Sequence, residues 1–175
     1  MKVFMTGGTG FVGTALTRRL IAEGHSVTIL TQSENDTRLR MPNLAYLIGN
    51  SNLPGNWQTA VKDHEVIINL AGASIFSRWT NEQKKILRAS RLDTTKNLVD
   101  ALPQDSKRMT LFSTSAVGYY GFHEDEELTE VSPEGADFLA RLAFDWEAEA
   151  LRAQNKGARV VITRFGIVLG QNGGA

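Results

Sequence analysis

The sequence contains no cysteine, and this absence excludes several classes of site at once. Without a thiol, the chain can form no disulfide framework, no thiolate metal centre and no cysteine nucleophile. It also lacks an excess of charge, because 19 lysines and arginines balance 19 aspartates and glutamates. A formal net charge of zero gives no electrostatic basis for binding nucleic acid or an anionic membrane. We therefore expect neither as a partner.

Long hydrophobic runs are missing as well. No apolar run approaches the roughly 20 residues that span a bilayer, and the apolar start is too short for a signal peptide. We therefore expect a soluble, cytoplasmic protein. The three histidines, at positions 25, 64 and 123, are not spaced as metal ligands, so no metal site is predicted. The acidic run at 124–127 is interpreted as a solvated loop.

Strand and helix patterns alternate along the chain. Strands are predicted at residues 2–6, 25–31, 45–48, 65–70, 109–113 and 160–170. Helices are predicted at residues 11–23, 56–62, 80–102 and 136–154. This alternation predicts a doubly wound parallel sheet, a three-layer α/β/α fold of the Rossmann type. The 175 residues suffice for one domain, and a chain that ends in a glycine-rich loop is expected to be part of a longer protein.

The first predicted strand breaks into glycines at Gly7, Gly10 and Gly13. In a strand–turn–helix context this spacing is typical of a dinucleotide site. One glycine permits the tight turn, one lets backbone amides approach a pyrophosphate, and one permits close helix packing. The alternative is a turn that serves only packing. The residues predicted to contact the cofactor here are Gly7, Gly8, Thr9, Gly10, Phe11, Val12 and Gly13.

The end of the second predicted strand bears on the choice of cofactor. An acidic residue in this place binds the ribose 2′-hydroxyl of NAD. Here the uncharged Gln32 and Ser33 occupy it, while Glu34 and Asp36 come slightly later. Arg38 lies within reach in the same loop, so Ser33 and Arg38 are predicted to contact a 2′-phosphate. NADP(H) is therefore preferred over NAD(H), and Gln32 is included in the predicted site.

Further stretches resemble a known family. Residues 6–13 read T-G-G-T-G-F-V-G, 69–72 read N-L-A-G, 113–121 read S-T-S-A-V-G-Y-Y-G, and 128–133 read L-T-E-V-S-P. Shorter runs are R-W-T at 78–80, S-R at 90–91 and the D-W-E-x-E-A that starts at 145. Together they are similar to an atypical branch of the extended short-chain dehydrogenases/reductases. This is the nucleoside-diphosphate-sugar epimerase-like branch of the NAD-dependent epimerase/dehydratase family.

The resemblance implies an NAD(P)-binding domain over residues 1–175, which longer members follow with a C-terminal substrate domain. It places Leu70, Ala71 and Gly72 beside the adenine and ribose side of the cofactor. It also gives the Ser115 hydroxyl the task of holding a substrate oxygen. The implied partner is a small molecule, with a nucleotide sugar as one candidate, and homodimerisation is left open.

The sequence departs from this family at its usual Tyr-x-x-x-Lys dyad. In that dyad a phenol transfers a proton, and a lysine one helical turn later lowers its pKa and holds the ribose. No tyrosine of this chain has a lysine four residues after it. Phe138 or Leu139 falls where the tyrosine belongs, and Leu142 or Ala143 where the lysine belongs. The sequence therefore supports cofactor binding more strongly than catalysis.

Other side chains are candidates for the missing roles. Tyr119 or Tyr120 could act as the acid, or the two rings could simply pack against the neighbouring helix. Arg141 could contact a ribose or phosphate, or be a solvated helix residue. Arg164 could approach the cofactor cleft or pair with a carboxylate at the sheet edge.

Two functions follow from these observations. The first is an NADP(H)-dependent epimerase or oxidoreductase that acts by hydride transfer. The second is a non-catalytic sensor or structural module that has kept the cofactor turn and lost the chemistry.

Overall fold

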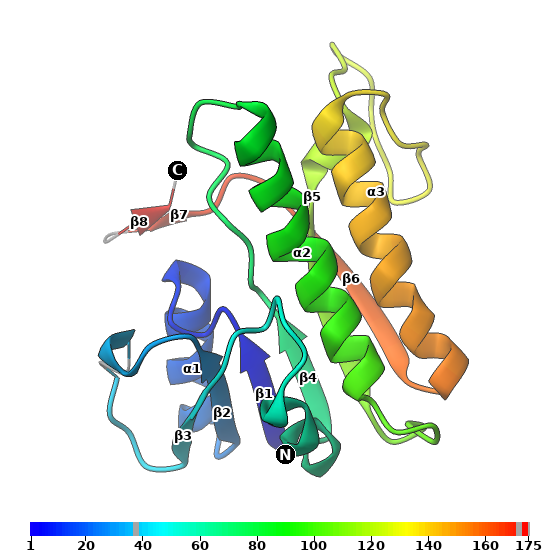
Figure 1. Ribbon diagram of the computed structural model, residues 1–175. Coiled ribbons are helices and arrows are strands. Elements are labelled where there is room, and N and C mark those ends of the chain that lie inside the picture. The colour runs from blue at the N-terminus through cyan, green and yellow to red at the C-terminus, as the bar shows by residue number, and fades with distance from the viewer. Residues whose placement is uncertain (37–38, 171–172, 175) are drawn as a thin grey trace.

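The computed structural model describes residues 1–36, 39–170 and 173–174. Its main feature is one parallel sheet of six strands in the order β3-β2-β1-β4-β5-β6 (Figure 1). The strands are β1 (Lys2–Thr6), β2 (Ser26–Thr31), β3 (Leu44–Ile48), β4 (Val66–Asn69), β5 (Thr110–Ala116) and β6 (Arg159–Phe165). The order reverses between β1 and β4, and such a switch point is where open α/β sheets bind ligands.

Three α-helices cover the sheet. They are α1 (Phe11–Ala22), α2 (Asn81–Ala101) and α3 (Phe138–Leu151). Figure 1 shows α2 and α3 side by side over one face of the sheet. Short 3₁₀ helices complete the helical segments: η1 (Glu34–Asp36), η2 (Asn56–Asp63), η3 (Val117–Tyr120) and η4 (Arg152–Lys156).

The alternation of side chains along β1 explains the layers. Val3 and Met5 belong to a core cluster into which Leu16 of α1 packs, whereas Phe4 belongs to a second cluster that includes Leu98 of α2. Successive residues of a strand point to opposite faces, so β1 contributes to both cores. Together with helices on both faces, this confirms the predicted Rossmann-type α/β/α architecture.

Element boundaries agree closely with the sequence prediction, with one main exception at the last strand. The strand predicted at 160–170 ends at Phe165, and Leu169–Gly170 instead forms β7, which pairs antiparallel with β8 (Gly173–Gly174). The ladder between β5 and β6 stops at this point because β5 ends at Ala116, the residue in register with Phe165. The predicted helix at 56–62 is the 3₁₀ helix η2.

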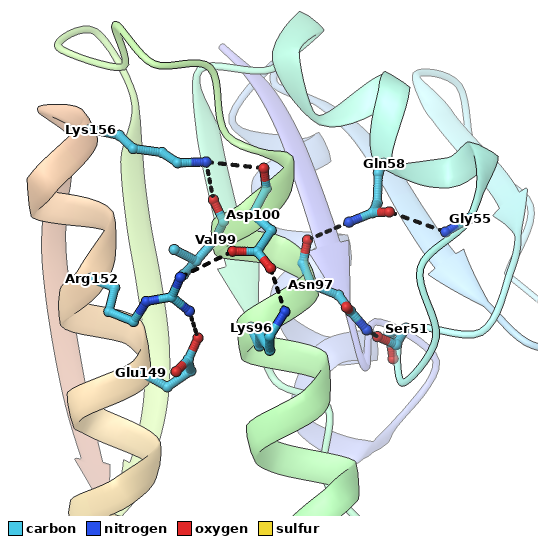
Figure 2. A network of polar contacts seen from close by, with 10 residues as sticks. All are labelled: Ser51, Gly55, Gln58, Lys96, Asn97, Val99, Asp100, Glu149, Arg152 and Lys156. Atoms are coloured by element: carbon cyan, nitrogen blue, oxygen red, sulfur yellow. Dashed lines mark hydrogen bonds and ion pairs between the residues drawn. The ribbon is translucent and has the colours of Figure 1, made fainter.

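Polar contacts anchor the C-terminal end of α2 (Figure 2). The Lys156 ammonium donates to the carbonyl oxygens of Val99 and Asp100, the two contacts that Figure 2 shows, at 2.9 and 3.0 Å. It also donates to the carbonyl oxygen of Leu102 at 2.8 Å. Carbonyl groups in the last turn of a helix lack the usual i+4 backbone donor, and a cation there also complements the helix dipole. The Val99 carbonyl oxygen additionally accepts from the Leu102 N–H at 3.2 Å. Arg152 pairs with Asp100 at 3.2 Å and also with Glu149. The network joins α2 to α3 and η4 at the end opposite the carboxyl edge of the sheet.

A side-chain hydrogen bond caps the start of α2. The Thr80 hydroxyl accepts a hydrogen bond from the Gln83 backbone N–H at 3.2 Å. Within the part of the chain that the structure describes, no helix combines the length and apolarity that a membrane span requires.

Candidate cofactor and substrate site

The glycine turn after β1 gives each of its three key glycines a separate task. Gly7 has a φ of +69°, and a Cβ there would lie 2.6 Å from the carbonyl carbon of Leu70. A Cβ at Gly13 would lie 2.2 Å from the carbonyl oxygen of Gly7. A Cβ at Gly10 would meet only that same oxygen, at 3.2 Å, and is otherwise in open space. Gly7 thus makes the turn, Gly13 permits close packing, and Gly10 leaves an open approach.

The N-terminus of α1 faces this open approach. Gly10 is its N-cap, no side chain caps the helix, and its first turn carries no acidic residue. Backbone N–H groups at a helix N-terminus that lack a cap favour an anion such as a pyrophosphate. Phe11 is partly exposed beside the turn, and a Cβ at Gly170 would lie 2.5 Å from its ring. The segment after β6 therefore passes directly over the turn.

The end of β2 presents uncharged groups to the same edge of the sheet. Gln32 is exposed and donates through Nε2 to Asn50 Oδ1 at 3.2 Å. The Ser33 hydroxyl accepts from the Asn35 backbone N–H at 3.1 Å. Arg38, which the sequence analysis placed at the 2′-phosphate, lies outside the described residues. Its predicted contact stays a prediction.

A cavity of about 420 Å³ lies at the carboxyl ends of β4, β5 and β6. Its lining joins the segment after β4 (Leu70, Ala71 and Gly72) to the end of β5, where Ser115 lies. The remaining lining is mostly apolar: Ile75, Phe76, Val117, Leu139, Leu142, Ala143, Trp146, Phe165, Ile167 and Val168, among others. Because Leu70 also packs against Gly7, this cavity adjoins the glycine turn.

The helix α3 contributes only apolar and aromatic side chains to this cavity. Leu139, Leu142, Ala143 and Trp146 are its lining residues, and none of them transfers protons. These positions include those where the usual dyad was expected. Phe138 instead packs edge-on against the ring of Trp79. The positions of the usual dyad on α3 therefore carry no proton donor.

Ser115 is held by a buried ion pair. Its hydroxyl donates to Glu147 Oε1 at 2.5 Å, and Arg164 donates to both carboxylate oxygens of Glu147, through Nε and Nη2, at 2.8 Å each. Arg164 therefore pairs with a carboxylate, one of the two alternatives left open by the sequence. The hydrogen bonds to Glu147 raise the pKa of Arg164 above its ordinary value. Since the Ser115 proton is committed to Glu147, its oxygen remains free only to accept.

The two tyrosines after β5 belong to the same network. The Tyr120 hydroxyl accepts from Arg164 Nη1 at 2.7 Å, and the Arg164 guanidinium lies 3.6 Å from the centre of the Tyr119 ring. Both rings are buried, and neither is among the residues that line the cavity. Their positions support the alternative in which the two rings pack, here around Arg164. No contact with the cavity supports the alternative in which one of them acts as the acid.

Arg141 lies on the exposed face of α3. It lines a shallow surface depression together with Arg88 and Asp145, apart from the cavity that holds Ser115. Its predicted contact with a ribose or phosphate therefore finds no support in its position.

Sequence reasoning missed two charged residues of the site. Glu147 and Arg91 occur in the motifs D-W-E and S-R, but the sequence predicts no role for either. Glu147 bonds Ser115, and Arg91 lines the cavity. Among the described residues, no group of three or more side chains is arranged to hold a metal ion.

Comparisons with known proteins establish the family of the chain. The family model for the NAD dependent epimerase/dehydratase family matches residues 3–175, and the chain belongs to that family. A curated relative, the chloroplastic epimerase family protein SDR39U1 homolog of Arabidopsis thaliana, is 38% identical over 185 residues, covering 100% of this chain and 51% of the relative. The chain thus spans about half the length of the curated relatives it matches.

Two solved structures are similar throughout. The human epimerase family protein SDR39U1 (isoform 2), solved with NADPH, has a TM-score of 0.77 at 34% identity, covering 100% of this chain and 57% of the human chain. The nucleoside-diphosphate sugar epimerase of Corynebacterium glutamicum has a TM-score of 0.81 at 34% identity, covering 99% of this chain and 35% of that chain.

Proposed function

We propose that the chain binds a nicotinamide dinucleotide, with NADP(H) preferred over NAD(H), as the cofactor-binding part of an epimerase or oxidoreductase. The observation that carries the proposal is the glycine turn, where Gly7 and Gly13 close the packing and Gly10 leaves the N-terminus of α1 open. That cradle fits a pyrophosphate, whose oxygens accept from backbone N–H groups. The similar human protein was solved with NADPH, which supports the same cofactor here.

The other predicted site residues lie along the carboxyl edge of the sheet, and each is proposed to contact a different part of the cofactor or substrate. Gln32 and Ser33 would lie at the ribose, where uncharged side chains tolerate a 2′-phosphate. The 70–72 segment would run alongside the cofactor into the cavity. When bound, a nicotinamide supplies or accepts a hydride. Ser115 Oγ, fixed by Glu147, would accept a hydrogen bond from a substrate hydroxyl. The substrate is a small molecule, and the family relationship makes a nucleotide sugar one candidate.

A second function has its own supporting observation. Because α3 offers only Leu139, Leu142, Ala143 and Trp146 to the cavity, the usual proton donor is missing from its usual place. A protein that binds the cofactor without turning over a substrate, as a sensor or structural module, fits that arrangement.

The test is a fluorescence titration of the full-length protein with NADPH and with NADH, followed by a turnover screen across carbonyl, carbinol and nucleotide-sugar compounds. Gly10→Val should abolish binding, because its side chain would fill the open approach, while the circular dichroism spectrum stays unchanged. Gly24→Asn, at the other end of α1 in open space, is the matched control and should bind normally. If the protein binds neither NADPH nor NADH, both proposed functions are wrong. Binding of NADPH without turnover favours the second.

A further inference from the structure

One charged side chain in the cavity has no role in the proposed function. Arg91 extends from α2 and, among the described residues that line the cavity, is the only ionisable one. Within the described parts of the chain, no carboxylate lies within ion-pair distance of it. The other partly buried arginine at this site, Arg164, is neutralised by two hydrogen bonds to Glu147. Buried charges are ordinarily paired, so the contrast calls for an explanation.

The guanidinium of Arg91 is held in place by neutral groups. It donates through Nη1 to the Leu87 carbonyl oxygen at 3.3 Å and to Ser90 Oγ at 3.4 Å, and through Nη2 to the Ala73 carbonyl oxygen at 3.1 Å. Its centre also lies 5.4 Å from the Trp146 ring. These contacts fix the orientation of the group without cancelling its charge. Burial accordingly lowers the pKa of Arg91.

Part of the hydrogen-bonding capacity of Arg91 is unused. A guanidinium carries five N–H donors, and the three bonds from Nη1 and Nη2 leave the Nε–H and one Nη2–H without a partner in the described structure. Gly72 lies against this part of the group, since a Cβ there would be 3.2 Å from Nη2 and 3.5 Å from Nε. Since the distance to Cζ is also 3.2 Å, the glycine of the N-L-A-G motif packs over the flat face of the guanidinium, where a larger side chain would displace it.

We propose that Arg91 binds the carboxylate of the substrate, so that the substrate class is a carboxylic acid whose body lies against the apolar walls of the cavity. A carboxylate accepts two parallel N–H bonds and carries the single negative charge that one arginine balances. The apolar lining from Leu70 to Val168 gives the body of the molecule its contacts. The proposal rests on the proposed function in taking this cavity as the substrate site.

The experiment compares two ligands that differ only in charge. Binding of 4-phenylbutyrate and of its neutral amide, 4-phenylbutanamide, to the full-length protein is measured by calorimetry, with and without NADPH. Wild type should bind the acid about tenfold more tightly than the amide, the size of one charge-assisted hydrogen bond. Arg91→Met should remove this preference and leave amide affinity unchanged. The amide is thus an internal check that the cavity is intact in the variant.

Two further variants keep the result interpretable. Arg91→Gln removes the charge while retaining a hydrogen-bonding side chain, and should lose the preference as Arg91→Met does. Arg88→Met, on the same helix but paired with Asp145 outside the cavity, is the control and should keep it. Equal affinity of wild type for acid and amide, or a preference that survives Arg91→Met, overturns the proposal.

The NADPH titration separates this inference from the proposed function. If NADPH does not bind but the acid preference depends on Arg91, the proposed function fails and the carboxylate site stands. If NADPH binds and the preference is absent, the carboxylate site alone fails. If Arg91→Met weakens NADPH as much as it weakens the acid, Arg91 holds a cofactor phosphate, and the substrate assignment is overturned.

Discussion

Gly13 packs so closely on Gly7 that a Cβ at Gly13 would lie 2.2 Å from the carbonyl oxygen of Gly7. The first turn of α1 therefore packs directly on the glycine turn. Glycine is required at position 13 for the fold itself and not only for the candidate site. Gly10 differs, because it faces open space. The glycines of one motif can be separated experimentally into those that hold the structure and those that admit the ligand.

Gly13→Ala should lower the free energy of unfolding by about 3 kcal/mol, since the methyl group forces the helix away from the turn. The gain in helix propensity, about 1 kcal/mol, is too small to compensate. Urea denaturation measures the change. Gly166→Ala, where no atom lies within 4 Å of the new methyl group, is the control and should stay within about 0.5 kcal/mol of wild type. Equal stability of the two variants would contradict the packing described.

Replacing each of two serines of β5 by alanine should change the stability of the protein in opposite directions. Ser113 Oγ is buried and has no hydrogen-bond partner among the described residues, so Ser113→Ala should raise stability by about 1 kcal/mol. Ser115→Ala removes the donor to Glu147 and should cost about 1–2 kcal/mol. Thermal and chemical denaturation of the two variants are the measurement. Changes of the same sign in both would show that the hydrogen-bond assignment is incorrect.

Thr95 links three elements, and its hydroxyl should matter more than its size suggests. It accepts from Asn69 Nδ2 and from Trp146 Nε1, both at 2.8 Å, and donates to the Arg91 carbonyl oxygen at 2.7 Å. Thr95→Val keeps the shape of the side chain but leaves two buried donors without an acceptor. It should lower the free energy of unfolding by about 2 kcal/mol or more. Thr163→Val, which loses only a 3.5 Å contact, is the comparison. A similar loss in both variants, measured by urea unfolding, would argue against a special role for Thr95.

Asp100 predicts a pH dependence of stability. The hydrogen bond from Lys96, aided by Arg152, lowers the pKa of this carboxyl below its ordinary value of 3.8. A group with a lowered folded-state pKa stabilises the protein above its unfolded value and loses that effect as the pH falls through the folded value. Asp100→Asn should therefore cost about 0.5–1 kcal/mol at pH 7, a small value because the pair is largely solvated. The deficit should shrink below pH 4 and vanish at lower pH.

The control for that series is Asp105→Asn. Asp105 makes a longer, more exposed contact with Lys107, at 3.7 Å, and its loss should change stability little at any pH. Urea midpoints measured from pH 7 down to pH 3 give both curves. A deficit for Asp100→Asn that grows on acidification would reverse the sign argued above.

The sequence predicts the glycine turn well because the need for glycine there is local. The positive φ of Gly7 and the close approach at Gly13 lie within a few residues of one strand and one helix. The alternation of strands and helices likewise predicts a parallel sheet covered on both faces, whereas the order of the six strands comes from the structure. The last strand is the most overestimated, because the apolar run continues past Phe165 whereas the ladder with β5 ends at the pair Ala116 and Phe165.

The network around Ser115 is not predictable in this way. Glu147 lies 32 residues from Ser115 and 17 from Arg164, so their contact depends on how α3 sits against β5 and β6. Motif spacing carries no such information, and the sequence could only leave two alternatives open for Arg164. The role of Arg91 was not predictable for the same reason, because only the structure shows that none of the described carboxylates pairs with it.

The strand order also has a consequence for synthesis on the ribosome. The central strand β1 is made first, yet its neighbour β4, with the Leu70 backbone that packs on Gly7, is made some 60 residues later. Val168, the last residue of the cavity wall, follows about 100 residues after Leu70, roughly 5–20 s of further translation. A nascent chain therefore completes the packing around the glycine turn well before it encloses the cavity beside that turn.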